Sequence, residues 1–260
     1  MNAARTIIIG DVHGCLRELD ELLLQLKPAA DDHLVFIGDL IDRGPDSAGV
    51  VKRVHALETH CRLDLVLGNH EEKLLRYLSH KQAGSHEWRN MRGIDEFDGL
   101  LLQLSDNHLQ FIANAHWFIK LPEINHIAVH GGLPAHLDLS GMERLPWGME
   151  KNLTKTFRLM NKLRFESHQG HFEALGTENS QSVYWANRYN GHWGAAVFGH
   201  HPFMQPQPCI FPNAIGLDTG CVYGGWLSAM VISNEKTEFV GVKAFDTYSK
   251  KTEYGKQGNP

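Results

Sequence analysis

Five short segments of this sequence carry side chains that bind metal ions and transfer protons, each beside one or more glycines. They are GDVHG (10–14), GDLIDRG (38–44), GNHE (68–71), HGG (130–132) and GHH (199–201). Six of their side chains offer oxygen or nitrogen atoms and no thiolate: Asp11, His13, Asp39, Asn69, His130 and His200. Mixed carboxylate and imidazole ligands favour Mn, Fe or Zn over Ca or Mg. Six donors exceed the need of one simple site, so they indicate two ions about 3.5–4 Å apart that share a bridging carboxylate.

The position of Asp39 supports this interpretation. It directly follows LVFIG (34–38), an apolar run typical of a buried strand. A carboxylate at the mouth of a buried strand is costly unless a partner compensates its charge. Two divalent ions would supply that compensation, hold a hydroxide at neutral pH and accept oxygens from a phosphoryl group.

Alternating strand and helix patterns position these segments. Short apolar runs predict strands, and amphipathic runs after each of the first three strands predict helices. The predicted strands are 6–10, 34–38, 63–68, 126–132, 195–199, 214–218 and 226–233, and the predicted helices are 15–26, 46–57 and 70–80. Such alternation indicates βαβ units with parallel strand pairing. The polar segments then lie at the carboxyl ends of the strands, where open α/β sheets bind ligands.

The chain reads as a single domain over residues 1–250. Residues 82–117 are expected to be helical, and the looser pattern of 134–182 predicts a largely helical insertion. The last residues, 251–260, are expected to form a flexible tail. The oligomeric state does not follow from the sequence.

Composition excludes several classes of protein. The formal net charge of −5 over 260 residues gives no electrostatic reason to expect a nucleic acid or membrane partner. No apolar run approaches the roughly 18–20 residues that span a bilayer, and the first residues lack a signal-peptide pattern. The four cysteines show no paired metal-ligand spacing and suit reduced thiols. A cytoplasmic protein is therefore expected.

The five motifs, in this order, resemble those of the phosphoprotein phosphatase (PPP) family of dimetal phosphoesterases, within the calcineurin-like metallophosphoesterase superfamily. The resemblance implies a mixed β-sandwich flanked by helices, with the metal site at the carboxyl ends of strands. It implies two divalent metal ions, with Mn²⁺ the leading choice and Fe or Zn as alternatives. Carried over by position, Asp11 and His13 would bind the first ion and Asp39 would bridge. The second ion would take Asn69, His130 and His200.

The same resemblance assigns the catalytic residues. His70 matches the general acid that protonates the leaving oxygen, and Asp42 matches its carboxylate partner. A carboxylate there would favour the protonated imidazole and keep it able to donate near neutral pH. Arg43 matches the phosphate-binding arginine, whose planar fork grips two phosphate oxygens. A short likeness around YWANRY (184–189) makes Arg188 the second arginine.

Two substrate classes remain open. The first is phosphomonoesters of the serine/threonine phosphoprotein type, hydrolysed by a metal-bridging hydroxide. The second is diadenosine tetraphosphate, cleaved by a bis(5'-nucleosyl)-tetraphosphatase, because LDTGCVYGG (217–225) resembles the signature of those hydrolases. Symmetrical tetraphosphatases typically lack the aspartate found at Asp42, and an alkoxide leaving group needs an acid more than a nucleotide does. The monoester substrate is therefore the main interpretation and the tetraphosphate the alternative.

Two further classes agree less well with the motifs. A phosphodiesterase of the wider superfamily would generally lack the arginine at position 43. A non-catalytic scaffold would be expected to have lost ligands, and all six are present.

Overall fold

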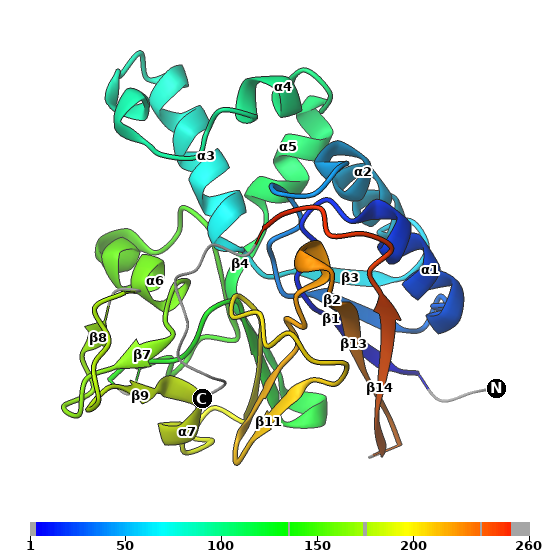
Figure 1. Ribbon diagram of the computed structural model, residues 1–260, viewed down its shortest axis with the longest axis vertical. Coiled ribbons are helices and arrows are strands. Elements are labelled where there is room, and N and C mark those ends of the chain that lie inside the picture. The colour runs from blue at the N-terminus through cyan, green and yellow to red at the C-terminus, as the bar shows by residue number, and fades with distance from the viewer. Residues whose placement is uncertain (1–3, 135, 174–175, 235, 251–260) are drawn as a thin grey trace.

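The structure is a computed structural model that describes residues 4–134, 136–173, 176–234 and 236–250. Two mixed β-sheets pack face to face, and helices cover the outer side of the first sheet (Figure 1). The first sheet has the order β14-β13-β1-β2-β3. Its strands are β1 (Thr6–Ile9), β2 (His33–Phe36), β3 (Arg62–Leu65), β13 (Trp226–Ser233) and β14 (Lys236–Lys243).

The second sheet has the order β11-β12-β10-β5-β4-β6. Its strands are β4 (His116–Leu121), β5 (His126–Val129), β6 (Arg144–Pro146), β10 (Ala195–Phe198), β11 (Cys209–Phe211) and β12 (Ala214–Gly216). A third, small sheet contains β7 (Phe165–Glu166), β8 (Phe172–Glu173) and β9 (Val183–Tyr184).

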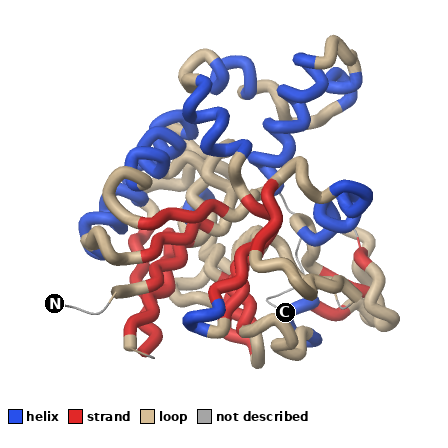
Figure 2. Tube along the Cα trace, turned by 180° about the vertical axis from the view of Figure 1, so that it is seen from behind, coloured by secondary structure: helices blue, strands red, loops and turns tan. Residues whose placement is uncertain are grey.

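Most of the helices lie above and beside the sheets, as the view from behind shows (Figure 2). The α-helices are α1 (Leu16–Leu26), α2 (Ser47–Leu57), α3 (Asn69–Gln82), α4 (Phe97–Leu101), α5 (Asp106–Ala113), α6 (Thr154–Met160) and α7 (Trp185–Arg188). Short 3₁₀ turns are η1 (Glu87–Asn90), η2 (Pro122–Ile124), η3 (Lys151–Leu153) and η4 (Cys221–Tyr223). None of the helices in the described ranges is both long and apolar enough to cross a bilayer.

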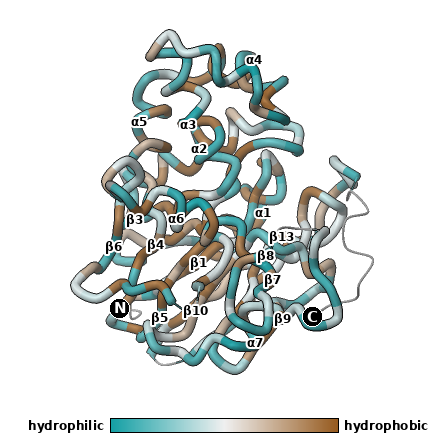
Figure 3. The backbone as a smooth tube through the Cα atoms, turned by 90° about the vertical axis from the view of Figure 1, so that its left-hand side faces the viewer, coloured by the Kyte–Doolittle hydropathy of each residue, from teal (hydrophilic) through white to brown (hydrophobic). Residues whose placement is uncertain are grey.

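The alternation of side chains along the strands builds two apolar layers. In β1, Ile7 and Ile9 point toward the helices, whereas Ile8 points into the space between the two main sheets. The inter-sheet layer joins Ile8 to Val35 of β2 and to Val197 of β10, and all three side chains are fully shielded from solvent. Figure 3 shows the resulting apolar stretches of backbone along the strands.

The predicted parallel pairing is confirmed. β2 pairs in parallel with both β1 and β3, and β10 pairs in parallel with β5 and β12. β13 completes the first sheet by pairing antiparallel with β1. The mixed β-sandwich flanked by helices is therefore the observed architecture, and the carboxyl ends of β1, β2, β3, β5, β10 and β12 meet at one edge.

Two predictions about the elements need correction. The segment 134–182 is not largely helical: its described residues hold α6, the η3 turn and short strands, and β6 belongs to the second main sheet. The segment 82–117 holds three short helical elements as expected, but β4 begins at its end, at His116. The sequence analysis also missed β14, which pairs along all eight residues of β13. The predicted tail, 251–260, lies outside the described residues.

Candidate metal centre

Six loops at the carboxyl ends of strands converge on one site. Three follow β1, β2 and β3 of the first sheet, and three follow β5, β10 and β12 of the second. Five residues in these loops adopt a left-handed backbone although none is glycine: His13, Asp39, Asp42, Arg43 and His200, with φ between 46° and 71°. Such conformations are uncommon for side-chain-bearing residues and cluster at functional sites.

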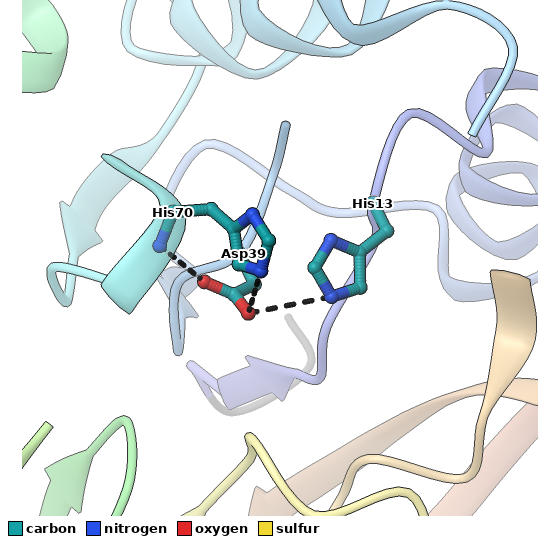
Figure 4. Close-up of side chains that lie close together, drawn as sticks. All are labelled: His13, Asp39 and His70. Carbon is teal, nitrogen blue, oxygen red and sulfur yellow. Dashed lines mark hydrogen bonds and ion pairs between the residues drawn. The ribbon is translucent and has the colours of Figure 1, made fainter. Parts of the chain in front are cut away.

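The Asp39 carboxylate lies between imidazole rings from different loops (Figure 4). Its Oδ2 is 3.3 Å from His13 Nε2, and its Oδ1 is 3.4 Å from His130 Nε2. Burial opposes ionisation, but His130 and the other neighbouring imidazoles hold the pKa of Asp39 well below its usual range. A buried carboxylate that is ionised and faces nitrogen ligands on both oxygens has the geometry of a bridging ligand.

Hydrogen bonds orient two of these histidines toward the site. His13 donates from Nδ1 to the Ile41 carbonyl at 2.8 Å, and His130 donates from Nδ1 to the Ile37 carbonyl at 2.8 Å. A carbonyl only accepts, so each Nδ1 carries a proton and Nε2 is the ring nitrogen that faces inward. Burial opposes protonation of His130, but Asp39 raises the pKa of His130 to about 9, so a cation would have to displace the proton on its Nε2. Nε2 of His13 accepts from Arg43 at 2.7 Å, which shows that it is available as a lone-pair donor.

His200 contributes a buried ring nitrogen, Nε2. Its Nε2 has no hydrogen-bond partner in the part of the chain that the structure describes. Burial and the nearby Arg164 lower the pKa of His200 well below its usual value, so the ring is neutral. A neutral buried imidazole without a partner is suited to a metal ion.

Two groups of donor atoms share Asp39. In one, Asp39 lies with His13 and His70; in the other, it lies with His130 and His200, all donor atoms within each group lying within 4.8 Å of one another. Asn69 joins the second group through its Oδ1, 3.1 Å from His130 Nε2. The donor sets therefore fit two divalent ions with Asp39 between them.

Asp11 lies at the same edge but is held differently. Its carboxylate accepts from the His200 backbone N–H, at 3.0 Å to Oδ2 and 3.2 Å to Oδ1. Burial and the nearby Asp218 raise the pKa of Asp11 well above its usual value. Burial also raises the pKa of Asp218 to about 6. Two buried carboxylates near each other repel when both are ionised, and a cation beside them would offset this repulsion and stabilise the ionised form of both.

His70 and Asp42 form the expected pair. His70 Nδ1 is 2.5 Å from Asp42 Oδ2, and the opposite ring nitrogen, Nε2, is 3.9 Å from Asp39 Oδ2. Asp42 also forms an ion pair with Lys73, whose Nζ is 3.4 Å from Asp42 Oδ2. The ring of His70 is thus oriented by one carboxylate and presents its other nitrogen to the donor cluster, as a proton donor requires.

The structure separates the candidate arginines. Arg43 reaches the cluster through its bond to His13 and lies over the Tyr223 ring at 5.7 Å. Arg188 instead donates to the Ser167 carbonyl at 2.8 Å and lines a different cavity. Arg164, which sequence reasoning did not identify, donates to the His200 carbonyl at 2.8 Å.

Sequence reasoning also assigned no role to Glu71, although it belongs to the GNHE motif. Glu71 is fully buried and accepts the backbone N–H groups of Asp39, Leu40 and Ile41 at 2.8, 2.8 and 3.2 Å. Burial, reinforced by Asp39, raises the pKa of Glu71 to about 7. These three bonds fix the loop that carries Asp39, so Glu71 positions a ligand. Its place in the GNHE motif was the sequence signal that could have identified this role.

Known proteins match this sequence over most of its length. A family model described as calcineurin-like phosphoesterase matches residues 4–204. The asymmetrical bis(5'-nucleosyl)-tetraphosphatase PrpE of Oceanobacillus iheyensis is 33% identical over 250 residues, which cover 90% of each chain. The symmetrical bis(5'-nucleosyl)-tetraphosphatase of Bordetella pertussis is 30% identical over 281 residues, covering 91% of this chain and 95% of the relative.

Solved structures with the same fold cover a similar share of the chain. The crystal structure of a protein provisionally named a diadenosine tetraphosphatase is 27% identical with a TM-score of 0.68, covering 92% of this chain and 94% of that one. A serine/threonine phosphatase from Saccharomyces cerevisiae is 14% identical with a TM-score of 0.60, covering 95% of this chain and 82% of its own. The second similarity shows a shared fold alone.

Proposed function

Because this chain belongs to the calcineurin-like phosphoesterase family, we propose that it hydrolyses a phosphoanhydride bond of bis(5'-nucleosyl) tetraphosphates such as diadenosine tetraphosphate. The observation that carries the proposal is the similarity to tetraphosphatases over about nine-tenths of both chains. It favours the alternative of the sequence analysis over its main interpretation, the phosphoprotein substrate. The substrate partner is then a nucleotide.

The proposed metal ligands are those of the sequence analysis. Asp11 and His13 would hold one divalent ion, Asn69, His130 and His200 the other, and Asp39 would bridge. Bound there, the two ions, with Mn²⁺ our first choice, would neutralise phosphate oxygens and lower the pKa of a water molecule near phosphorus. The unpartnered Nε2 of His200 and the inward Nε2 atoms of His13 and His130 support this assignment.

Protein side chains supply the remaining chemistry. Arg43 would grip non-bridging phosphate oxygens with its planar fork, since its guanidinium already lies at the donor cluster. His70 would hand the proton on its inward nitrogen, Nε2, to the leaving oxygen, with Asp42 stabilising the protonated ring through Nδ1. A water molecule forms the new P–O bond as the bond to the leaving oxygen breaks, and the proton that this water releases to solvent replaces the one that His70 gave up.

A second candidate function is favoured by one specific observation. The Asp42–His70 pair is formed at 2.5 Å, and such an assisted acid benefits a poor leaving group most. Phosphoserine and phosphothreonine esters have poor leaving groups. Phosphomonoester hydrolysis therefore remains the competing proposal.

A direct comparison of substrates separates the two proposals. The Mn²⁺-loaded protein at neutral pH is given diadenosine tetraphosphate and, separately, a phosphoserine peptide, and kcat/KM is measured for each. We expect the tetraphosphate to be favoured at least tenfold, which is about 1.4 kcal/mol of transition-state discrimination. Chromatography identifies the products: two ADP molecules mean symmetrical cleavage, and ATP with AMP means asymmetrical cleavage. A tenfold peptide advantage would overturn the proposal.

Arg164, rather than Arg188, is expected to be the second phosphate-binding arginine. Arg164→Ala should lower kcat/KM for diadenosine tetraphosphate by roughly 10²-fold, because it removes a half-buried cation beside the site. Arg188→Ala, the matched control, should change kcat/KM by less than about threefold, since its guanidinium contacts Ser167 away from the cluster. The reverse order of effects would restore Arg188 to the role that the sequence suggested.

A further inference from the structure

A cationic cavity of about 560 Å³ lies along helix α3, beyond the proposed acid. Lys73 and Arg76 line it from α3, Arg92 from the segment after η1, and Lys162 from the segment after α6. Figure 1 shows α3 running outward from the edge of the sheets. We call these four residues the cationic groove.

The groove holds more positive than negative charge. Glu72 is buried and pairs with Arg76 at 3.3 Å and with Arg158 at 2.7 Å, so one carboxylate serves two guanidinium groups. Glu87 also lines the cavity, where its carboxylate pairs with His80 at 3.7 Å. Within the described residues, neither Arg92 nor Lys162 forms an ion pair. An excess of cations in a protein of net charge −5 indicates a local preference for anions.

The groove is connected to the proposed active site by a short chain of contacts. Lys73 Nζ lies 3.4 Å from Asp42, and Asp42 lies 2.5 Å from His70. Lys73 follows His70 by three residues, so both side chains lie on neighbouring turns of one face of α3. The groove therefore begins within about one turn of α3 from the proposed acid, on the side of His70 that contacts Asp42.

We propose that the cationic groove binds the phosphate groups of the departing nucleotide. This inference rests on the proposed function, because it assumes a leaving group that carries phosphates. Arginine forks match phosphate oxygens in pairs, and lysines add positive charge that follows a flexible chain. A serine or threonine leaving group has no phosphate to place there. The groove thus selects for polyphosphate substrates over simple monoesters.

Charge reversal at the two residues outside the ion pairs tests the groove. The double variant Arg92→Glu with Lys162→Glu leaves Lys73, Asp42 and His70 unchanged. We expect KM for diadenosine tetraphosphate to rise by about tenfold or more, while kcat/KM for p-nitrophenyl phosphate stays within about twofold. The matched control, Lys52→Glu with Lys236→Glu, makes the same change in net charge at exposed positions on α2 and β14. It should leave both substrates within about twofold of the unmodified chain.

Several results would overturn the proposed phosphate-binding role of the cationic groove. They are an unchanged KM for the tetraphosphate, an equal loss on both substrates, the same loss in the control variant, or a loss confined to an acidic phosphopeptide. If the unmodified chain does not hydrolyse the tetraphosphate, the proposed function fails, and the groove is still decided by binding. The dissociation constant of ATP, measured by calorimetry with EDTA present, should then be about tenfold higher in the groove variant than in the unmodified chain. Equal dissociation constants for the groove variant and the unmodified chain would refute phosphate binding by the groove.

Discussion

Asp39→Asn is expected to lower kcat/KM by roughly 10³-fold or more, because it removes the negative charge between two cation positions that supply several kcal/mol of transition-state stabilisation. The substitution keeps the size of the side chain and one oxygen, so the loss reports charge rather than volume. Elemental analysis after dialysis should find fewer than two ions per chain. Activity and metal stoichiometry are measured on the same preparation.

The control for this variant is Asp20→Asn, which removes a carboxylate that pairs with Arg53 at the surface. It should bind metal and turn over substrate like the unmodified chain, because exposed ion pairs contribute little. Circular dichroism must show that the Asp39→Asn variant still folds, since Asp39 also accepts the His70 backbone N–H at 3.0 Å. A folded variant that retains two ions and full activity would refute the bridging role.

His70→Asn has the second largest expected effect, and it depends on the substrate. With an alkyl phosphate, loss of the acid should lower kcat by roughly 10²–10⁴-fold. With p-nitrophenyl phosphate the loss should stay below about tenfold, because that leaving group departs without a proton. Diadenosine tetraphosphate should behave like the aryl ester, since a nucleotide is also a good leaving group.

Asp42→Asn provides the comparison for His70→Asn. It keeps the imidazole but removes the carboxylate that lies 2.5 Å from Nδ1, so it should produce the same order of substrates with smaller losses. Rates are measured for all three substrates under saturating Mn²⁺. Equal losses on alkyl and aryl esters would contradict proton donation by His70.

Local signals in the sequence were sufficient to predict where the candidate metal site lies. Each proposed ligand follows a short apolar strand, and parallel strands bring their carboxyl ends to one edge without further information. The same pattern reaches Asp218, which follows β12, but LDTGCVYGG (217–225) was interpreted as a substrate signature and its aspartate was not assigned to the site. Glu71 was equally visible within its motif. Both were missed because the family resemblance assigned a role to neither.

Arg164 could not be found in this way. It lies in a segment without helical or strand periodicity, and it reaches the site through a contact with the His200 carbonyl, 36 residues away. Only the packing of that segment beside the loop after β10 makes the contact. The prediction of a largely helical 134–182 failed for a related reason: its apolar residues pack against existing sheets and helices instead of forming a regular face.

The substrate interpretation changed because one residue was given too much weight. Asp42 is present and paired with His70, as expected, but the pairing describes how a proton is held and not which molecule receives it. Similarity over nine-tenths of the chain to a protein named bis(5'-nucleosyl)-tetraphosphatase carries more weight than a single aspartate. The cationic groove is a candidate for a surface that meets the substrate.

The left-handed backbone at His13, Asp39, Asp42, Arg43 and His200 has a consequence for the life of the protein in a cell. Each such residue costs about 1–2 kcal/mol relative to an unstrained backbone, in a fold whose net stability is small. Ions that bind only the folded chain offset that cost by mass action. The fraction of unfolded chain, and with it the exposure to proteases, therefore rises when metal is scarce. Metal supply would set how long each molecule survives as well as how fast it works.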